Sequence, residues 1–143
     1  MRKHILVIDD DAAFRSLLMM RLESTGHTVD TAETGWEGLG KLEHADYDVV
    51  LLDYMMPGIT GLTFLQHIHA CRPSVPVVMM TSHTSSQVVA HALAAGARAC
   101  LVKPVDPVEL EQALQRCVGT PAKSGRIKRH DTKSMEMRQG KDR

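Results

Sequence analysis

Short, uninterrupted apolar runs constrain the fold of this chain more than any other feature of its sequence. Val49–Leu52 is such a run, and others occupy residues 5–8, 75–80 and 99–102, with a shorter one around Val29. Runs of this length are typical of strands that are buried on both faces, as in a parallel sheet. The sequence therefore predicts five short strands.

Segments with a helical period separate the predicted strands. From Asp11, which we interpret as a charge at a helix N-terminus, apolar residues recur on one face until Gly26: Phe14, Leu17, Leu18 and Leu22. The later helices are predicted to begin at Thr34, Thr60, Ser85 and Asp106, and the last presents Val108, Leu110, Ala113 and Leu114. Five strands that alternate with five helices predict an α/β fold built on a doubly wound parallel sheet.

Composition and charge change near the C-terminal end of the chain. Residues 1–121 contain 9 Lys or Arg against 14 Asp or Glu, whereas residues 122–143 contain 8 against 3. No apolar period continues beyond Gly119, where Gly, Ser, Lys and Arg dominate. We therefore predict one domain at 1–118 and a basic, disordered tail or linker at 119–143. The opposite charges of the two parts argue against nucleic acid as the main partner.

The cysteines and the N-terminal residues bear on the compartment of the protein. Cys71, Cys100 and Cys117 form no CxxC pair, so we expect reduced thiols rather than a zinc site. The first residues are basic and then apolar for only four positions, which is too short for a signal peptide. No apolar stretch has membrane-spanning length, so the sequence predicts a cytoplasmic protein without a membrane partner. Four of its scattered histidines are expected to face solvent: His27, His44, His67 and His69.

Polar residues stand at the carboxyl ends of four predicted strands, and such ends lie on one rim of a parallel sheet. These residues are Asp9, Asp10, Asp53, Thr81 and Lys103. Three carboxylates that converge repel one another and favour a bound cation, and oxygen ligands without Cys or His favour Mg²⁺. Lys103 and Thr81 would then neutralise and orient a phosphoryl group. Asp53, ionised at neutral pH, would accept that group as a nucleophile.

These residues belong to motifs that occur in a fixed order. The motifs are Asp9-Asp10, Asp53-x-x-Met56-Pro57-Gly58, Thr81-Ser82, and Gly96-Ala97 followed by Lys103-Pro104. Over about residues 3–118 the chain resembles the receiver domain of bacterial two-component response regulators. That resemblance implies a flavodoxin-like sheet with strand order 2-1-3-4-5. It also implies a sensor histidine kinase or phosphotransfer protein as phosphoryl donor and an unknown downstream protein as target. A homodimer through the last two helices and the fifth strand is a further implication.

The resemblance implies a role for each residue of the predicted site. Asp53 would be the phosphoacceptor, and Lys103 would contact the phosphoryl oxygens while Thr81 moves to bond them. Asp10, Asp53 and the backbone carbonyl of Met55 would hold Mg²⁺, with Asp9 acting directly or through a water. The peptide bond between Lys103 and Pro104 is expected to be cis. Beyond its own phosphorylation and dephosphorylation, the chain is expected not to be an enzyme.

One position departs from the family pattern. Receivers commonly have Tyr or Phe where this chain has Cys100, and that ring swings inward when the threonine moves. Because a cysteine cannot reproduce this movement, we expect a shift of Thr81 alone, or of the helix at 85–95, to carry more of the signal.

Three alternatives remain open at this point. An aspartyl phosphohydrolase would usually carry a second Asp two residues after its nucleophile, and Met55 at that position argues against it. A phosphorylation-independent interaction module would be favoured by degenerate acids, yet all five key positions are filled. The chain can also be the N-terminal receiver of a longer regulator whose output domain lies beyond residue 143.

Overall fold

The computed structural model describes residues 2–57, 59–83 and 85–118. Its main sheet has five parallel strands in the order β2-β1-β3-β6-β7. They are β1 (His4–Ile8), β2 (Thr28–Ala32), β3 (Val49–Asp53), β6 (Val77–Thr81) and β7 (Ala99–Val102). The expected order 2-1-3-4-5 is confirmed. The labels differ because a hairpin of two short strands, β4 (Met55–Met56) and β5 (Ile59–Thr60), follows β3 and was not predicted.

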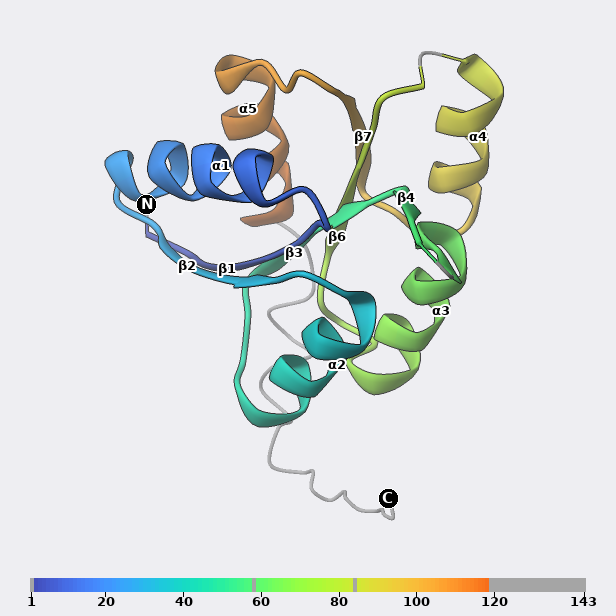
Figure 1. Cartoon of the computed structure of the whole chain (residues 1–143), viewed down its shortest axis with the longest axis horizontal. Coiled ribbons are helices and arrows are strands. Elements are labelled where there is room, and N and C mark those ends of the chain that lie inside the picture. Colours follow the sequence, from blue (N-terminus) through green and yellow to red (C-terminus); the bar gives the residue numbers. More distant parts are fainter. Residues whose placement is uncertain (1, 58, 84, 119–143) are drawn as a thin grey trace.

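Five helices alternate with the strands of the main sheet, as the sequence predicts. They are α1 (Ala12–Ser24), α2 (Gly35–His44), α3 (Gly61–Cys71), α4 (Ser86–Ala94) and α5 (Pro107–Val118). Helices α1 and α5 lie on one face of the sheet, whereas α2 and α3 lie on the other, where α4 also packs (Figure 1). The α/β doubly wound fold is therefore confirmed. None of these helices combines the length and the apolar character that a bilayer crossing requires.

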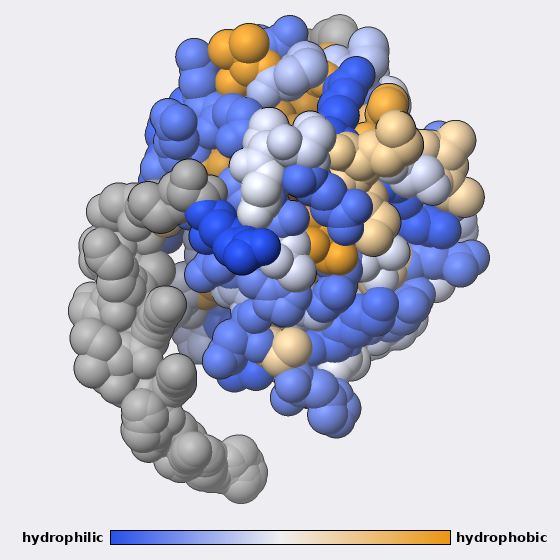
Figure 2. All heavy atoms as spheres, turned by 90° about the vertical axis from the view of Figure 1, so that its left-hand side faces the viewer, coloured by the Kyte–Doolittle hydropathy of each residue, from blue (hydrophilic) through white to orange (hydrophobic). Residues whose placement is uncertain are grey.

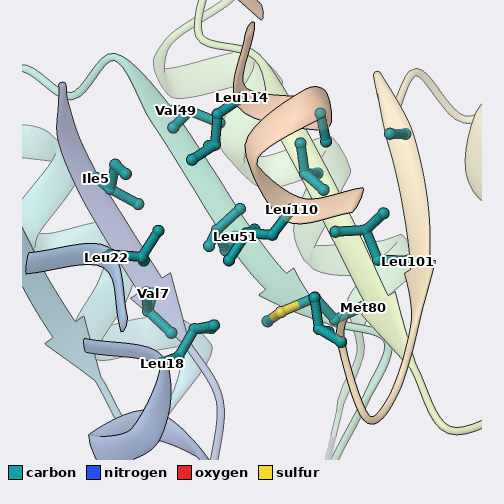
Figure 3. Close-up of a cluster of buried hydrophobic side chains, with 14 of the residues drawn as sticks. Ile5, Val7, Leu18, Leu22, Val49, Leu51, Met80, Leu101, Leu110 and Leu114 are labelled. Atoms are coloured by element: carbon teal, nitrogen blue, oxygen red, sulfur yellow. The ribbon is translucent and has the colours of Figure 1, made fainter. Parts of the chain in front are cut away.

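Two apolar clusters, one on each face of the sheet, hold the layers together. Alternate residues of a strand point to opposite faces, so Ile5 and Val7 join the cluster under α1 and α5, while Leu6 and Ile8 join the other. Figure 3 shows the first cluster, in which Leu18, Leu22, Leu110 and Leu114 meet the strands. Every residue of β3 and β6 is buried, which explains their uninterrupted apolar runs.

Helix α1 buries a narrower stripe than its sequence predicts. Leu18 and Leu22 are buried, but Leu17 is 42% exposed and lies about 100° around the helix from Leu18. Val108 is 62% exposed because it lies about 200° around α5 from the buried Leu110. The prediction that these two residues face the core is wrong. The side of the molecule that carries α1 in Figure 1 is largely hydrophilic, with apolar patches between polar residues (Figure 2).

His27 also departs from the expectation, since it is buried with 7% exposure rather than facing solvent. Its Nδ1 accepts a hydrogen bond from the backbone N–H of Lys3 at 3.1 Å, and its Nε2 lies 3.5 Å from a carboxylate oxygen of Glu111. These polar partners allow an imidazole to be buried, and a single sequence does not reveal them.

The five predicted helix starts are confirmed, and each carries an N-cap near the carboxyl rim of the sheet. Backbone N–H groups donate to the side chains of Asp11 (3.1 Å), Thr34 (3.0 Å), Thr60 (3.3 Å), Ser85 (3.1 Å) and Asp106 (3.0 Å). The caps set where each strand end gives way to its helix, and so help to fix the geometry of that rim.

The predicted tail at 119–143 lies outside the described residues.

Two glycines of α2 should respond in opposite ways to replacement by Ala. A Cβ at Gly35 would overlap the ring of Phe64, so Gly35→Ala should cost about 1–3 kcal/mol of stability. A Cβ at Gly40 meets no atom within 4 Å, so Gly40→Ala should add about 0.5–1 kcal/mol by favouring the helix. Urea unfolding followed by circular dichroism measures both. Equal effects of the two substitutions would contradict this packing of α2 on α3.

Candidate functional site

The carboxyl ends of β1 and β3 bring three acidic side chains together. Asp9 and Asp10 follow β1, and Asp53 is the last residue of the neighbouring β3. Asp9 is 0% exposed and Asp53 is 5% exposed, whereas Asp10 is open to solvent. Each offers a carboxylate oxygen within 4.8 Å of those of the other two. This acidic group, Asp9, Asp10 and Asp53, is the convergence that the sequence predicts.

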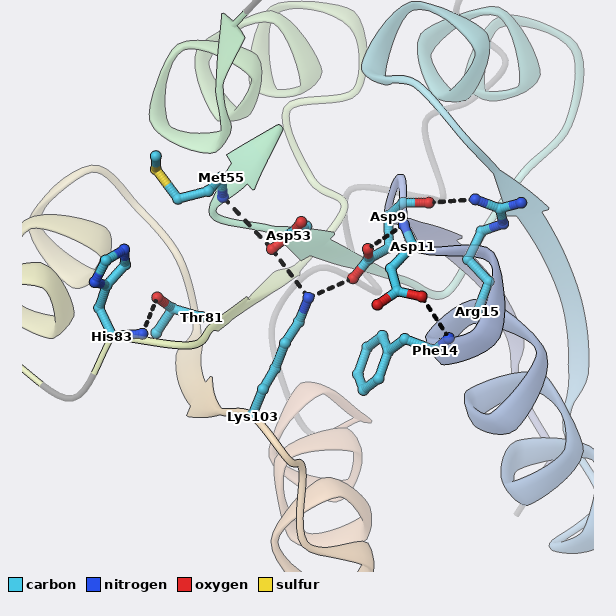
Figure 4. A network of polar contacts seen from close by, with 9 residues as sticks. All are labelled: Asp9, Asp11, Phe14, Arg15, Asp53, Met55, Thr81, His83 and Lys103. Carbon is cyan, nitrogen blue, oxygen red and sulfur yellow. Dashed lines mark hydrogen bonds and ion pairs between the residues drawn. The ribbon is translucent and has the colours of Figure 1, made fainter. Parts of the chain in front are cut away.

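Lys103 reaches the acidic group from the end of β7. Its Nζ donates to Oδ2 of Asp9 at 2.7 Å and lies 3.2 Å from Oδ1 of Asp53 (Figure 4). The backbone N–H of Lys103 donates to the carbonyl of Thr81 at 2.7 Å, which ties its strand end to β6. The bond between Lys103 and Pro104 is cis, as the resemblance implies. One ammonium therefore bridges carboxylates from two separate strands.

Backbone and side-chain contacts from α1 support Asp9. The N–H of Asp11 donates to Oδ1 of Asp9 at 2.9 Å, and Nη1 of Arg15 donates to the Asp9 carbonyl at 2.7 Å. The same Asp11 caps α1 through its own carboxylate, as interpreted from the sequence. Asp9 is thus held by the loop that starts the helix.

Gly61 allows α3 to approach the end of β3 closely. Its N–H donates to the carbonyl of Tyr54 at 2.7 Å, and a Cβ at this position would lie 2.5 Å from the carbonyl oxygen of Asp53. A side chain there would force α3 away from the end of β3. This role of Gly61 was not predicted, although a Gly directly after the Thr60 cap was a usable signal.

Thr81 is buried at the end of β6, on the same rim as the acidic group. Among the described residues, its oxygen accepts a hydrogen bond from the N–H of His83 at 3.0 Å. The predicted movement of Thr81 toward a phosphoryl group stays a prediction. So does the role of the Met55 carbonyl, although the Met55 N–H donates to Oδ1 of Asp53 at 3.4 Å. Cys100 is half-buried on β7 and packs against the cluster under α2 and α3.

Burial sets the electrostatics of the site. Loss of hydration, together with the charge of Asp9, raises the pKa of Asp53 to about 6, although Lys103 opposes the shift. Burial alone would lower the pKa of Lys103, but the bond to Asp9 and the charge of Asp53 outweigh it and raise that pKa. At neutral pH the site holds three carboxylates and one ammonium. The excess of two negative charges and the all-oxygen donor set fit a hard divalent cation.

A model of the response regulator receiver domain matches residues 5–115. The chain belongs to this family. The site described above occupies the matched region, and the motifs that suggested the family lie in it at the strand ends.

Solved receiver domains share the fold. A CheY-like receiver domain protein from Methanospirillum hungatei is 33% identical with a TM-score of 0.74, and the match covers 82% of this chain and 98% of that one. Chemotaxis protein CheY4 of Vibrio cholerae is 33% identical with a TM-score of 0.75, covering 82% and 99%. In NtrX from Brucella abortus the likeness covers 91% of this chain but only 29% of that one, with 28% identity and a TM-score of 0.78.

Curated relatives are longer proteins. Transcriptional regulatory protein ZraR of Salmonella typhimurium is 32% identical over 121 residues, which are 85% of this chain and 27% of that protein. Transcriptional regulatory protein GlrR of Escherichia coli is 38% identical over 111 residues, or 78% and 25%. The chain therefore spans about a quarter of the length of these relatives.

Replacing Asp53 by Asn should raise the free energy of unfolding in metal-free buffer at neutral pH, because it removes a charge that the fold disfavours. The folded pKa of about 6 lies above the ordinary value of 3.8, so the folded chain binds the extra proton between these values. The wild type therefore loses stability as the pH rises through this window, and the Asn variant does not. We expect a gain of about 1–2 kcal/mol above pH 7 that shrinks as the pH falls through about 6 and is lost below about 4.

Urea unfolding of both proteins in chelator, repeated across this pH range, measures the effect. The control is the same comparison in an excess of divalent cation. The cation neutralises the acidic group, so the wild type should then have the higher free energy of unfolding. An Asn variant that is less stable than the wild type at every pH in chelator would contradict the account.

Proposed function

We propose that Asp53 accepts a phosphoryl group in a Mg²⁺-dependent reaction and that the chain signals through the resulting conformational change. The observation that carries this proposal is the Lys103 ammonium, which lies between the Asp9 and Asp53 carboxylates beside Asp10. Membership of the receiver family supports it. The phosphoryl donor is a sensor histidine kinase or a phosphotransfer protein.

The chemistry needs no general base. Asp53 is ionised at neutral pH with a pKa of about 6, so its carboxylate oxygen can attack the phosphorus directly. A new bond forms between that oxygen and phosphorus, the bond from phosphorus to the donor's imidazole nitrogen breaks, and the nitrogen keeps the electron pair. Lys103 then turns from the carboxylates to the phosphoryl oxygens, whose charge it neutralises.

The acidic group holds the Mg²⁺ in this proposal. Asp10, Asp53 and the backbone carbonyl of Met55 would be its ligands, and Asp9 would act directly or through a water. When bound, the ion would supply charge neutralisation for the incoming phosphoryl oxygens. The buried Asp9 is already bonded to Lys103, which favours the exposed Asp10 as the more available ligand.

Phosphorylation changes the conformation of Thr81 and α4, and a downstream protein recognises the changed surface. Thr81 would exchange its hydrogen bond with the His83 N–H for one to the phosphoryl group. Because Cys100 stands where an aromatic residue is common, no ring at this position would move together with Thr81. The face formed by α4, β7 and α5 is the surface for a homodimer. Beyond its own phosphorylation and dephosphorylation the chain catalyses no reaction.

Two other functions give different results. A phosphohydrolase would turn over added phosphoesters, but Met55 occupies the place of the usual second Asp. A phosphorylation-independent module would ignore phosphoryl donors altogether. The greater length of the curated relatives favours the reading in which this chain is the receiver part of a longer regulator.

Incubation with acetyl phosphate and Mg²⁺ tests the proposal. Intact mass should show one added phosphoryl group in the wild type and none in Asp53→Asn. Asp46→Asn, a change at an exposed carboxylate between α2 and β3, is the matched control and should keep the addition. Absence of the adduct in the wild type, or its persistence in Asp53→Asn, would refute phosphorylation of Asp53.

Substitutions at two adjacent carboxylates should affect the Mg²⁺ affinity differently. Asp10→Asn removes a proposed ligand and should weaken Mg²⁺ binding on the order of tenfold or more. Asp11→Asn keeps a side chain that caps helices well, so its affinity should stay within about threefold of the wild type. Isothermal titration calorimetry measures both. Equal losses in the two variants would show that the ion responds to general acidity rather than to the proposed ligands.

A further inference from the structure

The aromatic ring of Phe14 forms part of the environment of the Lys103 ammonium. Nζ of Lys103 lies 4.5 Å from the centroid of this ring, and Figure 4 shows the ring beside the lysine side chain. An ammonium has three protons. Two of its neighbours are Oδ2 of Asp9 at 2.7 Å and Oδ1 of Asp53 at 3.2 Å. The ring supplies a third favourable contact through its negative face.

The position of Phe14 is set by α1 and not by the lysine. Its backbone N–H donates to the N-cap Asp11 at 3.1 Å, in the first turn of the helix. Its side chain is half-buried and packs against the cluster under α1 and α5. The ring therefore stays in place when Lys103 changes partners. Phe14 was predicted only as part of the apolar face of the helix, and the helical period does not indicate its contact with Lys103.

A divalent cation at the acidic group would change the balance around Lys103. It would take carboxylate oxygens that the ammonium contacts, and its charge would repel the ammonium. Without another favourable contact, the lysine would gain by turning toward solvent. A ring face attracts the cation without offering an oxygen that competes with the phosphoryl group. A leucine is also apolar and would fill part of the space, but it lacks this attraction.

We propose that Phe14 is a positioning residue that keeps the Lys103 ammonium in the site while its carboxylate partners turn to the metal and the phosphoryl group. This inference rests on the proposed function of Asp53. Its observable consequence is a coupling between the ring and the ammonium. The plain alternative is that Phe14 acts only as an apolar residue of the core.

Binding of beryllofluoride, an analogue of the phosphoryl group, at saturating Mg²⁺ provides the first test by calorimetry. Phe14→Leu should weaken it about fivefold to thirtyfold, the range for a largely desolvated contact between a cation and a ring. Phe14→Tyr keeps a ring and should bind within about twofold of the wild type. Phe64→Leu is the control, because it removes a ring that contacts Trp36 and His67 instead, and it should leave the affinity unchanged.

A double-mutant cycle in metal-free buffer provides a second test that needs no phosphoryl chemistry. Urea unfolding of the wild type, Phe14→Leu, Lys103→Met and the double variant gives the cost of losing the ring with and without the ammonium. We expect the change in the unfolding constant caused by Phe14→Leu to be at least about threefold larger when Lys103 is present.

Equal costs in the two backgrounds would overturn the proposal and leave Phe14 as a core residue. If Lys103→Met does not fold, the calorimetry decides, since equal affinities of the Leu and Tyr variants would also overturn it. A wild-type chain that binds no beryllofluoride would instead contradict the proposed function of Asp53, and the metal-free cycle would then decide the role of Phe14.

Discussion

The site depends on one ammonium that compensates two buried carboxylates. Asp9 is removed from water entirely and Asp53 almost so, and a buried carboxylate without a cation is costly. Lys103 comes from a strand end 94 residues after Asp9 in the sequence. Only a sheet that brings β1, β3 and β7 to one rim can provide this contact, so the electrostatics of the site and the topology of the fold depend on each other.

Lys103 neutralises the carboxylates only in part, and this makes the site reactive. One lysine leaves an excess of negative charge, and the pKa of Asp53 rises to about 6 as a result of burial and of the charge of Asp9. The folded chain therefore retains an unfavourable interaction that a bound divalent cation would relieve. Sites of this kind commonly cost stability while they support function. The surrounding apolar clusters and helix caps supply the stability that tolerates it.

Much of the fold was predictable because its signals are local. Apolar runs such as Val49–Leu52 mark buried strands, and N-caps such as Asp11 and Thr60 mark helix starts. The strand order and the cis bond before Pro104 came from family resemblance, since neither period nor composition encodes them.

Features that depend on packing in three dimensions were not predictable. Leu17 and Val108 are apolar residues of regular helices, yet they face solvent because each helix buries only the stripe that meets the sheet. His27 is buried because partners far along the chain satisfy it. The contact of Phe14 with Lys103 likewise joins segments that nothing in the sequence relates.

A crystal structure of the chain with Mg²⁺ and beryllofluoride tests the central claim most directly. The account predicts a single ion bound by Asp10 and Asp53, beryllofluoride on the Asp53 carboxylate, and the Lys103 ammonium against a fluorine atom. An ion or beryllofluoride bound elsewhere, or a Lys103 side chain directed away from the acidic group, would contradict it.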